Sequence, residues 1–225
     1  MNEPEKPKKG WGWLQWGFII VVSLIGISLI VPTIGFTASM ANQTASANNA
    51  RQIIMALKIW ASENNGVFPD SKLPPPVSSN QVLRRLIQNE ILEDEKIFGA
   101  TNSPFVPDGN IGLSPDYSEA CEPGENHWML VAGLRSDTNG IYPVIFENAL
   151  EPIWPPRWRF DSRLKPVRGR TWRQGTSILG RADNSVNVEK LVKKEGGLML
   201  PDSYLKALEK ESAPPITILD IEEKK

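Results

Sequence analysis

The strongest hydrophobic pattern of the chain lies near its start. No charged residue occurs between Lys9 and Arg51, and residues 16–36 are predominantly apolar. A helix needs roughly 20 such residues to cross the hydrocarbon core of a bilayer. The pattern therefore predicts that residues 11–36 form a membrane-spanning helical segment.

The basic residues around this segment predict its orientation. Lys6, Lys8 and Lys9 precede the apolar run, and the next positive charge is Arg51. Positive charge next to a membrane span favours the cytoplasmic side. We therefore expect a single-pass protein, with leader 1–10 in the cytoplasm and the bulk of the chain on the other side of the membrane.

A cleaved secretory signal peptide is the competing interpretation. Its apolar region is about 7–15 residues long and ends at a cleavage site of small residues. The triplets Thr37-Ala38-Ser39 and Ala45-Ser46-Ala47 have that composition. The apolar run here is longer and continues through Pro32, so we favour a retained anchor.

The helical pattern continues beyond the anchor. Small residues fill positions 37–50, and Ile53, Leu57 and Trp60 then recur at the spacing of one apolar helix face. Gly66 follows as a helix stop. We expect one helix over residues 11–65, with 11–36 in the membrane and 37–65 as the soluble half.

The remaining pattern predicts an α+β head domain over residues 66–211, followed by a polar tail over 212–225. A helix capped by Asn80 comes first, and Pro143 predicts an edge position for the second strand. Residues 129–134 and 141–146 are expected to form one β-hairpin, and residues 177–181 and 185–188 a second. A short helix is expected at 204–210. This small antiparallel sheet should pack on the stripe formed by Leu57 and Trp60.

Composition narrows the functional classes. The net charge of −1 gives no basic surface for nucleic acid, and one cysteine excludes an internal disulfide and a cysteine-rich zinc site. The acidic run Glu93–Glu95 is a poor calcium loop because it lacks a glycine turn, so we interpret it as a solvated helix end. No cofactor and no metal site are predicted.

Candidate catalytic residues are few. His127 can be paired with Glu125 or Asp183 as an acid–base pair, but a hydrogen-bonded histidine at the start of a strand is the favoured interpretation. Cys121 lies beside acidic residues, which disfavour a thiolate. Nucleophile-elbow and phosphate-loop motifs are absent. The sequence therefore predicts no enzyme, and a tethered hydrolase is the least supported hypothesis.

An arginine- and tryptophan-rich loop occupies residues 152–176. Its candidate partner-binding residues are Trp154, Trp158, Arg159 and Trp172, because interleaved aromatic and guanidinium groups stack on sugars or bases and bind acidic groups. Alternatively, the indoles attach a surface loop to the sheet while the arginines stay in water. We favour the second interpretation, and any recognition surface is expected here.

Two segments resemble the N-terminal region of type IV pilins and type II secretion pseudopilins. Lys8-Lys9-Gly10 is similar to the end of the leader, Trp11 takes the aromatic first position, and Pro32 takes the place of the proline in the hydrophobic helix. The helix ending from Asn49 to Asp70 also resembles that of major pseudopilins. The family usually carries glutamate at the position of Gln15.

The resemblance implies cleavage after Gly10, methylation of Trp11, and helix assembly through Gln15 and Pro32. The implied fold is pilin-like, with a long helix packed on a small sheet. The implied function is that of a pseudopilin or minor pilin in a type II secretion or type IV pilus-like assembly. Its partners would be other pilin-like subunits, the membrane, prepilin peptidase and the secretion or pilus machinery. The implied location is the cell inner membrane, with the N-terminus cytoplasmic and the C-terminal domain periplasmic or extracellular. The alternative is an unprocessed single-pass envelope protein that binds partners through its head domain.

Overall fold

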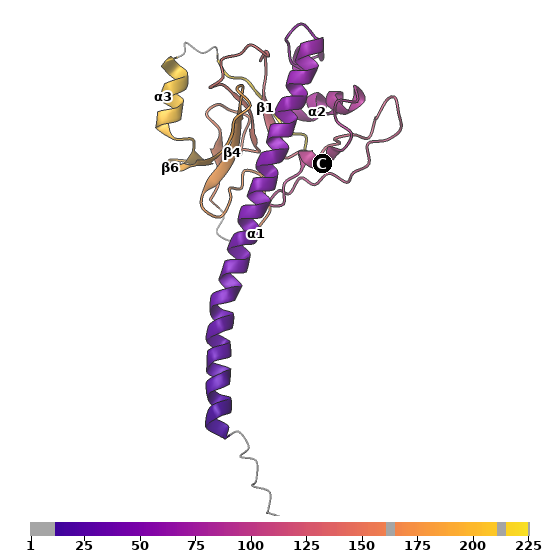
Figure 1. The fold of residues 1–225 in the computed structure, drawn as a ribbon. Helices are drawn as coiled ribbons and strands as arrows, with labels where there is room; N and C mark the ends of the chain where they lie inside the picture. The colour runs from indigo at the N-terminus through magenta and orange to yellow at the C-terminus, as the bar shows by residue number, and fades with distance from the viewer. Residues whose placement is uncertain (1–11, 161–164, 211–214, 225) are drawn as a thin grey trace, which may run out of the picture. The chain divides into compact units, whose positions relative to one another are not determined.

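A computed structural model describes residues 12–160, 165–210 and 215–224, without the side chains of Leu14 and of residues 29–36. The chain divides into two compact units, Met1–Ala41 and Asn42–Lys225. Helix α1 (Trp13–Glu63) begins in the first unit and ends in the second (Figure 1). The predicted helix is thus present, with both ends within two residues of the expected positions.

The C-terminal end of α1 has the predicted glycine stop. Asn65 and Gly66 both adopt positive φ, at 57° and 77°. The Gly66 N–H then donates to the carbonyl of Ala61 at 2.8 Å. This is the usual way in which a left-handed turn satisfies the last carbonyls of a helix.

A five-stranded antiparallel sheet forms the centre of the second unit. Its strand order is β5-β4-β2-β1-β8. The strands are β1 (Trp128–Val131), β2 (Pro143–Glu147), β4 (Thr176–Arg181), β5 (Val186–Lys190) and β8 (Ile218–Leu219). Both predicted hairpins, β1–β2 and β4–β5, are confirmed, so the head is α+β with an antiparallel sheet.

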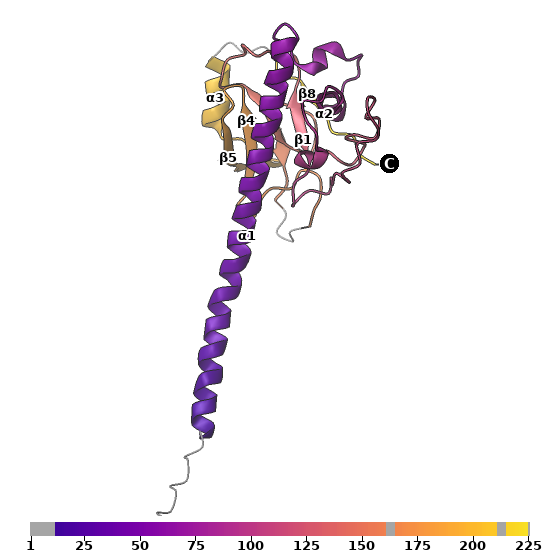
Figure 2. The ribbon, with the colours of Figure 1, turned by 45° about the vertical axis from the view of Figure 1, so that its right-hand side comes forward.

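The later part of α1 lies across one face of this sheet. Ile53, Leu57 and Trp60 are all buried there, as the apolar stripe predicts. Gly180 of β4 lies against Ile54 of α1, where any side chain on the strand would collide with the helix. Figures 1 and 2 both show this segment of α1 in front of the sheet.

Smaller elements complete the second unit. Helix α2 (Ser79–Gln88) and helix α3 (Asp202–Lys210) lie on opposite sides of α1 in both views (Figure 2). A second sheet has the order β3-β7-β6, from β3 (Arg157–Trp158), β6 (Val192–Lys194) and β7 (Gly197–Met199). Two 3₁₀ helices, η1 (Pro69–Lys72) and η2 (Glu95–Phe98), precede β1.

Three predictions about individual strands and helices are wrong. Pro143 does not mark an edge strand, because β2 lies in the middle of its sheet. Pro143 is the first residue of β2, where a proline does not interrupt the hydrogen bonds of the strand interior. The cap of α2 is Ser78, in a capping box with Gln81, and Asn80 lies inside the helix. The polar tail contains β8, which pairs with β1 and buries Ile218 and Leu219.

Candidate functional site

The arginine- and tryptophan-rich loop is attached to the head by its indoles. Trp158 is fully buried and Trp172 is nearly so, whereas Trp154 is half-buried and Arg159 is exposed. The Trp158 indole N–H donates to the backbone carbonyl of Glu147 at 3.2 Å, and its ring meets Phe146 edge-on. Trp158 and Trp172 therefore have no free face for a partner, and the accessible candidates are Trp154 and Arg159.

The carboxylate of Glu147, at the end of β2, is the centre of a buried polar network. Its Oε1 accepts hydrogen bonds from His127 Nε2 at 3.1 Å and from Trp172 Nε1 at 2.8 Å. Its Oε2 accepts from the Ser177 hydroxyl at 3.1 Å and from the Ile178 N–H at 2.9 Å. The four donors satisfy both oxygens of this buried side chain.

The side chain of Asn148 assigns the tautomer of His127. The Asn148 Oδ1 accepts the Gly169 N–H at 2.7 Å, so its Nδ2 faces His127 Nδ1, at 2.8 Å. Nδ1 is therefore the acceptor, and Nε2 carries the proton that is donated to Glu147. His127 is thus a fully hydrogen-bonded histidine immediately before β1, as the favoured interpretation predicts.

This arrangement does not form a nucleophile–base pair. Ser177 and His127 both donate to Glu147, so no hydrogen bond runs from the serine to the imidazole. All three side chains are buried, which keeps solvent and substrate away from them. The network instead joins β1, β2, β4 and the 152–176 loop.

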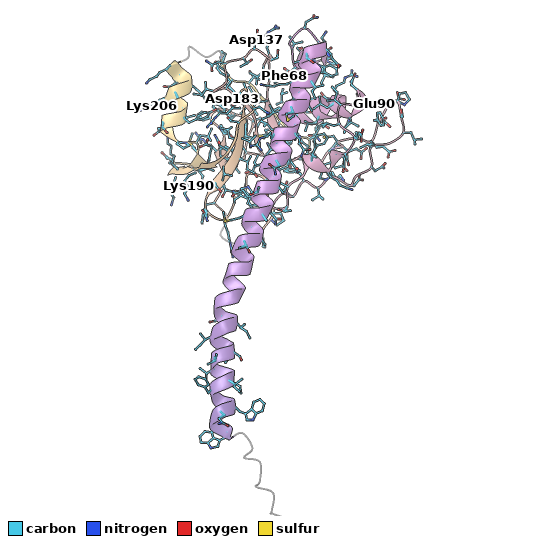
Figure 3. All side chains as sticks on the ribbon, in the orientation of Figure 1. Phe68, Glu90, Asp137, Asp183, Lys190 and Lys206 are labelled. Carbon is cyan, nitrogen blue, oxygen red and sulfur yellow. The ribbon has the colours of Figure 1, made fainter. Side chains whose placement is uncertain are left out.

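The other proposed partners of His127 lie elsewhere. Asp183 is in the β4–β5 turn, where its Oδ1 accepts the Ser185 N–H at 2.9 Å, and Figure 3 places it on the side of the head that carries Lys206 of α3. Glu125 is buried and its Oε2 accepts the Glu122 N–H. Cys121 is buried as well, and burial followed by the nearby Glu95 charge raises the pKa of its thiol. A raised thiol pKa leaves less of the reactive thiolate, which agrees with the predicted low reactivity of Cys121.

A surface pocket of about 330 Å³ lies beside Trp154. Leu150, Glu151, Ile153, Pro155, Arg157 and Gly196 line it together with that indole. Arg159 follows Arg157 by two residues, and its backbone N–H donates to the Gly169 carbonyl at 2.7 Å. The pocket offers an aromatic face and one guanidinium, and it lies where the sequence places a recognition surface.

The residues implied in processing and assembly are at the start of the chain. Gly10 and Trp11 lie outside the described residues. Gln15 accepts the Gly12 N–H at 3.0 Å and so caps the first turn of α1. Pro32 lies within α1, but its side chain is outside the description.

The part of α1 in the first unit exposes large apolar side chains. Trp13 and Phe18 are 81% and 71% exposed. Further exposed members are Trp16, Ile20, Val21, Val22, Leu24, Ile25 and Ile27. Exposed apolar surfaces of this extent are uncommon on monomeric soluble proteins.

Within the side chains that the structure describes, no helix combines the length and the apolar character needed to cross a membrane. Comparisons of the chain with protein-family models, curated proteins and solved structures find no match.

Proposed function

We propose that this protein is a membrane-anchored, pilin-like structural subunit of a type II secretion pseudopilus or a type IV pilus-like assembly. The observation that carries the proposal is the composition of α1. One helix supplies exposed apolar side chains such as Phe18 and Leu24 in the first unit and the buried stripe of Ile53, Leu57 and Trp60 in the head.

The proposed mechanism assigns one role to each part of this helix. The segment before Arg51 carries no charge after Lys9, so it can lie in lipid or against the same segment of a neighbouring subunit without burying an ion. The later segment holds the sheet of the head through Ile54 and its neighbours. A subunit built in this way displays its head outside the membrane.

Gln15 fits this proposal as a neutral residue. Its amide oxygen is used within its own chain, on the Gly12 N–H. It carries no charge that needs a partner in lipid, and equally it cannot neutralise the terminal amine of a neighbouring subunit. We therefore place the protein among subunits whose assembly depends on apolar helix packing rather than on that ion pair.

Mass spectrometry of the N-terminus of the native chain tests the proposal. We expect the mature protein to begin at methylated Trp11. A Gly10→Val variant should keep Met1. The matched Gly12→Val variant should be processed normally, since a Cβ added at Gly12 meets no atom within 4 Å. A native chain that begins at Met1, or after one of the small-residue triplets, would contradict the proposal.

A further inference from the structure

The pocket beside Trp154 is lined by residues of the segment 150–157 and by Gly196 in the turn between β6 and β7. The Leu150 N–H donates to the Arg157 carbonyl at 2.9 Å, which closes this segment into a loop. Arg157 also begins β3, which pairs with β7. Backbone hydrogen bonds therefore hold both parts of the lining, and the pocket is formed before any ligand arrives.

The indole of Trp154 gives the pocket an aromatic face that is held in place. The ring is half-buried and meets Phe146 of β2 edge-on, with 6.4 Å between the ring centroids. Ile153 adds an exposed apolar side chain to the same lining. A fixed aromatic ring binds a ligand with an apolar face at a small cost in conformational entropy.

Two side chains of opposite charge line the same pocket without pairing with each other. The carboxylate of Glu151 and the guanidinium of Arg157 are both exposed, and neither has a hydrogen bond or an ion pair among the described residues. The guanidinium lies against Gly196, where an added Cβ would stand 3.0 Å from Nη1. Both charged groups are therefore available to a ligand.

These groups limit the class of ligand. A carboxylate only accepts hydrogen bonds and a guanidinium only donates them, whereas a hydroxyl group does both. Glu151 would repel a phosphate or another anion, and Arg157 would repel a cation. A neutral ligand that combines several hydroxyl groups with an apolar face satisfies the carboxylate, the guanidinium and the indole together. Sugar rings have this combination.

We propose that this pocket binds a neutral glycan, with one sugar ring stacked on Trp154 and its hydroxyl groups bonded to Glu151 and Arg157. The volume of about 330 Å³ is at the small end of the range for ligand pockets, so it suits one or two sugar rings of a longer chain. The head would thus attach to a polysaccharide. This inference concerns the head alone and does not rest on the proposed anchoring or assembly.

Titration of the full-length chain with trisaccharides, in a detergent without a sugar headgroup, tests the proposal. The probes are trisaccharides of glucose, galactose, mannose and N-acetylglucosamine, each at up to about 10 mM, where a ligand of millimolar affinity occupies most sites. We expect saturation-transfer NMR to show binding of at least one of them. Trp154→Ala, Glu151→Gln and Arg157→Gln should each lower its affinity about tenfold or more, because each removes a ring contact or a charge-assisted hydrogen bond.

The matched controls are Phe160→Ala and Arg159→Gln. They change an exposed aromatic ring and an exposed guanidinium of the same loop, and neither residue lines the pocket. Both control variants should bind the sugar as the native chain does. A loss of affinity in the controls equal to that in the pocket variants would overturn the assignment to this pocket.

Glu151→Gln and Arg157→Gln change exposed side chains, so they keep the test informative even if Trp154→Ala fails to fold. Absence of binding by all four trisaccharides would overturn the proposal. An affinity that stays unchanged in Glu151→Gln and Arg157→Gln would also overturn it. A zwitterionic peptide, trialanine, is titrated in parallel, and binding of this peptide in place of the sugars would assign the pocket to a peptide instead. None of these results depends on how the N-terminus is processed.

Discussion

Gly180 of β4 lies directly against Ile54 of α1. A Cβ on Gly180 would stand 2.5 Å from Cδ1 of Ile54 and 2.6 Å from Cγ2 of Ile145 on the neighbouring strand. Real Cβ atoms do not approach other carbons this closely, so only glycine fits between the helix and the sheet. This contact sets how closely α1 packs on the centre of the head.

Gly180→Ala should therefore destabilise the head domain. The added methyl group must displace either the helix or β2, and overpacking of this kind costs about 1–3 kcal/mol. Urea unfolding followed by tryptophan fluorescence measures the change in the free energy of unfolding.

Ile54→Val provides the matched compensating variant, because it removes the Cδ1 atom that the new methyl group would meet. Alone it should cost about 0.5–1.5 kcal/mol, as Ile→Val changes in cores do. In the Gly180→Ala protein, Ile54→Val should lower the free energy of unfolding by less than it does in the native protein. Strict additivity of the two changes would show that α1 does not pack on β4 at this point.

Glu147→Gln should destabilise the protein although it preserves the shape of the side chain. The glutamine amide cannot accept hydrogen bonds with its nitrogen, so either the pair His127 and Trp172 or the pair Ser177 and Ile178 loses its acceptor. Leaving buried donors unpaired costs about 1–3 kcal/mol each. The expected loss in chemical unfolding is about 2–5 kcal/mol in total.

The control is Glu151→Gln, which changes an exposed carboxylate on the following loop and should alter stability by less than about 0.5 kcal/mol. A native-like unfolding midpoint for Glu147→Gln would mean that the network around this residue is not formed.

Trp158→Ala and Phe160→Ala test whether the 152–176 loop is attached to the head through the buried indole of Trp158. Trp158 is fully buried, and its truncation should cost about 3–5 kcal/mol, as for other large core aromatics. Phe160, on the same loop, is 64% exposed and should cost little. Comparison of the two unfolding curves checks this, and equal costs would contradict the assignment of Trp158 to the core.

The buried carboxyl groups of Glu95 and Glu125 predict a pH dependence of the stability of the protein. Since the folded-state pKa values of Glu95 and Glu125 are raised, their contribution to stability is present below the ordinary value of 4.5 and is lost as pH rises through the raised values. Glu125→Gln removes one of these two groups. Its unfolding temperature should therefore fall less than that of the native chain as pH rises from about 4 to 7.

Glu93→Gln supplies the comparison, because it changes the same residue type on an exposed position of the same segment. It should follow the native pH profile. Parallel profiles for all three proteins would show that burial in the folded state does not raise the pKa of Glu125.

Much of the fold can be predicted from local patterns. The helix α1 follows from the uncharged run and from the spacing of Ile53, Leu57 and Trp60, and its end follows from Gly66. The β1–β2 and β4–β5 hairpins follow from apolar strands separated by turn residues. These features depend on neighbouring residues, so a single sequence contains the signal.

Features that depend on distant residues could not be predicted. β8 pairs with β1 across about ninety residues of chain, and its two residues carry no pattern of their own. The sheet β3-β7-β6 is similarly assembled from short strands. Glu95 was expected at a solvated helix end, but it is buried because Gly109 and Cys121 from later segments close over it.

In the candidate site, too, features set by neighbouring residues were predicted and features set by distant residues were not. The sequence identified His127 as a hydrogen-bonded histidine but assigned no partner, because Glu147 and Asn148 belong to another strand. It identified the 152–176 loop as indole-attached without showing that Trp158 and Trp172 both donate to Glu147. Glu147 itself carried no signal, since one acidic residue after an apolar strand has many possible roles.

The central claim is that α1 anchors the head in a membrane and places it on the outer side. A cysteine at Asp137, in the exposed turn between β1 and β2, tests the claim (Figure 3). The native Cys121 gives no background, because it is buried and its thiol pKa is raised. Cells with a permeabilised outer membrane are treated with a membrane-impermeant maleimide, and the membranes are then washed in alkaline carbonate.

The measurement is the fraction of Asp137→Cys protein labelled before lysis in the carbonate-resistant pellet. The account predicts that the chain stays in the pellet and is labelled before lysis, whereas an exposed cysteine on a cytoplasmic control protein is labelled only afterwards. Recovery of the chain in the carbonate supernatant, or labelling of Asp137→Cys only after lysis, would contradict it.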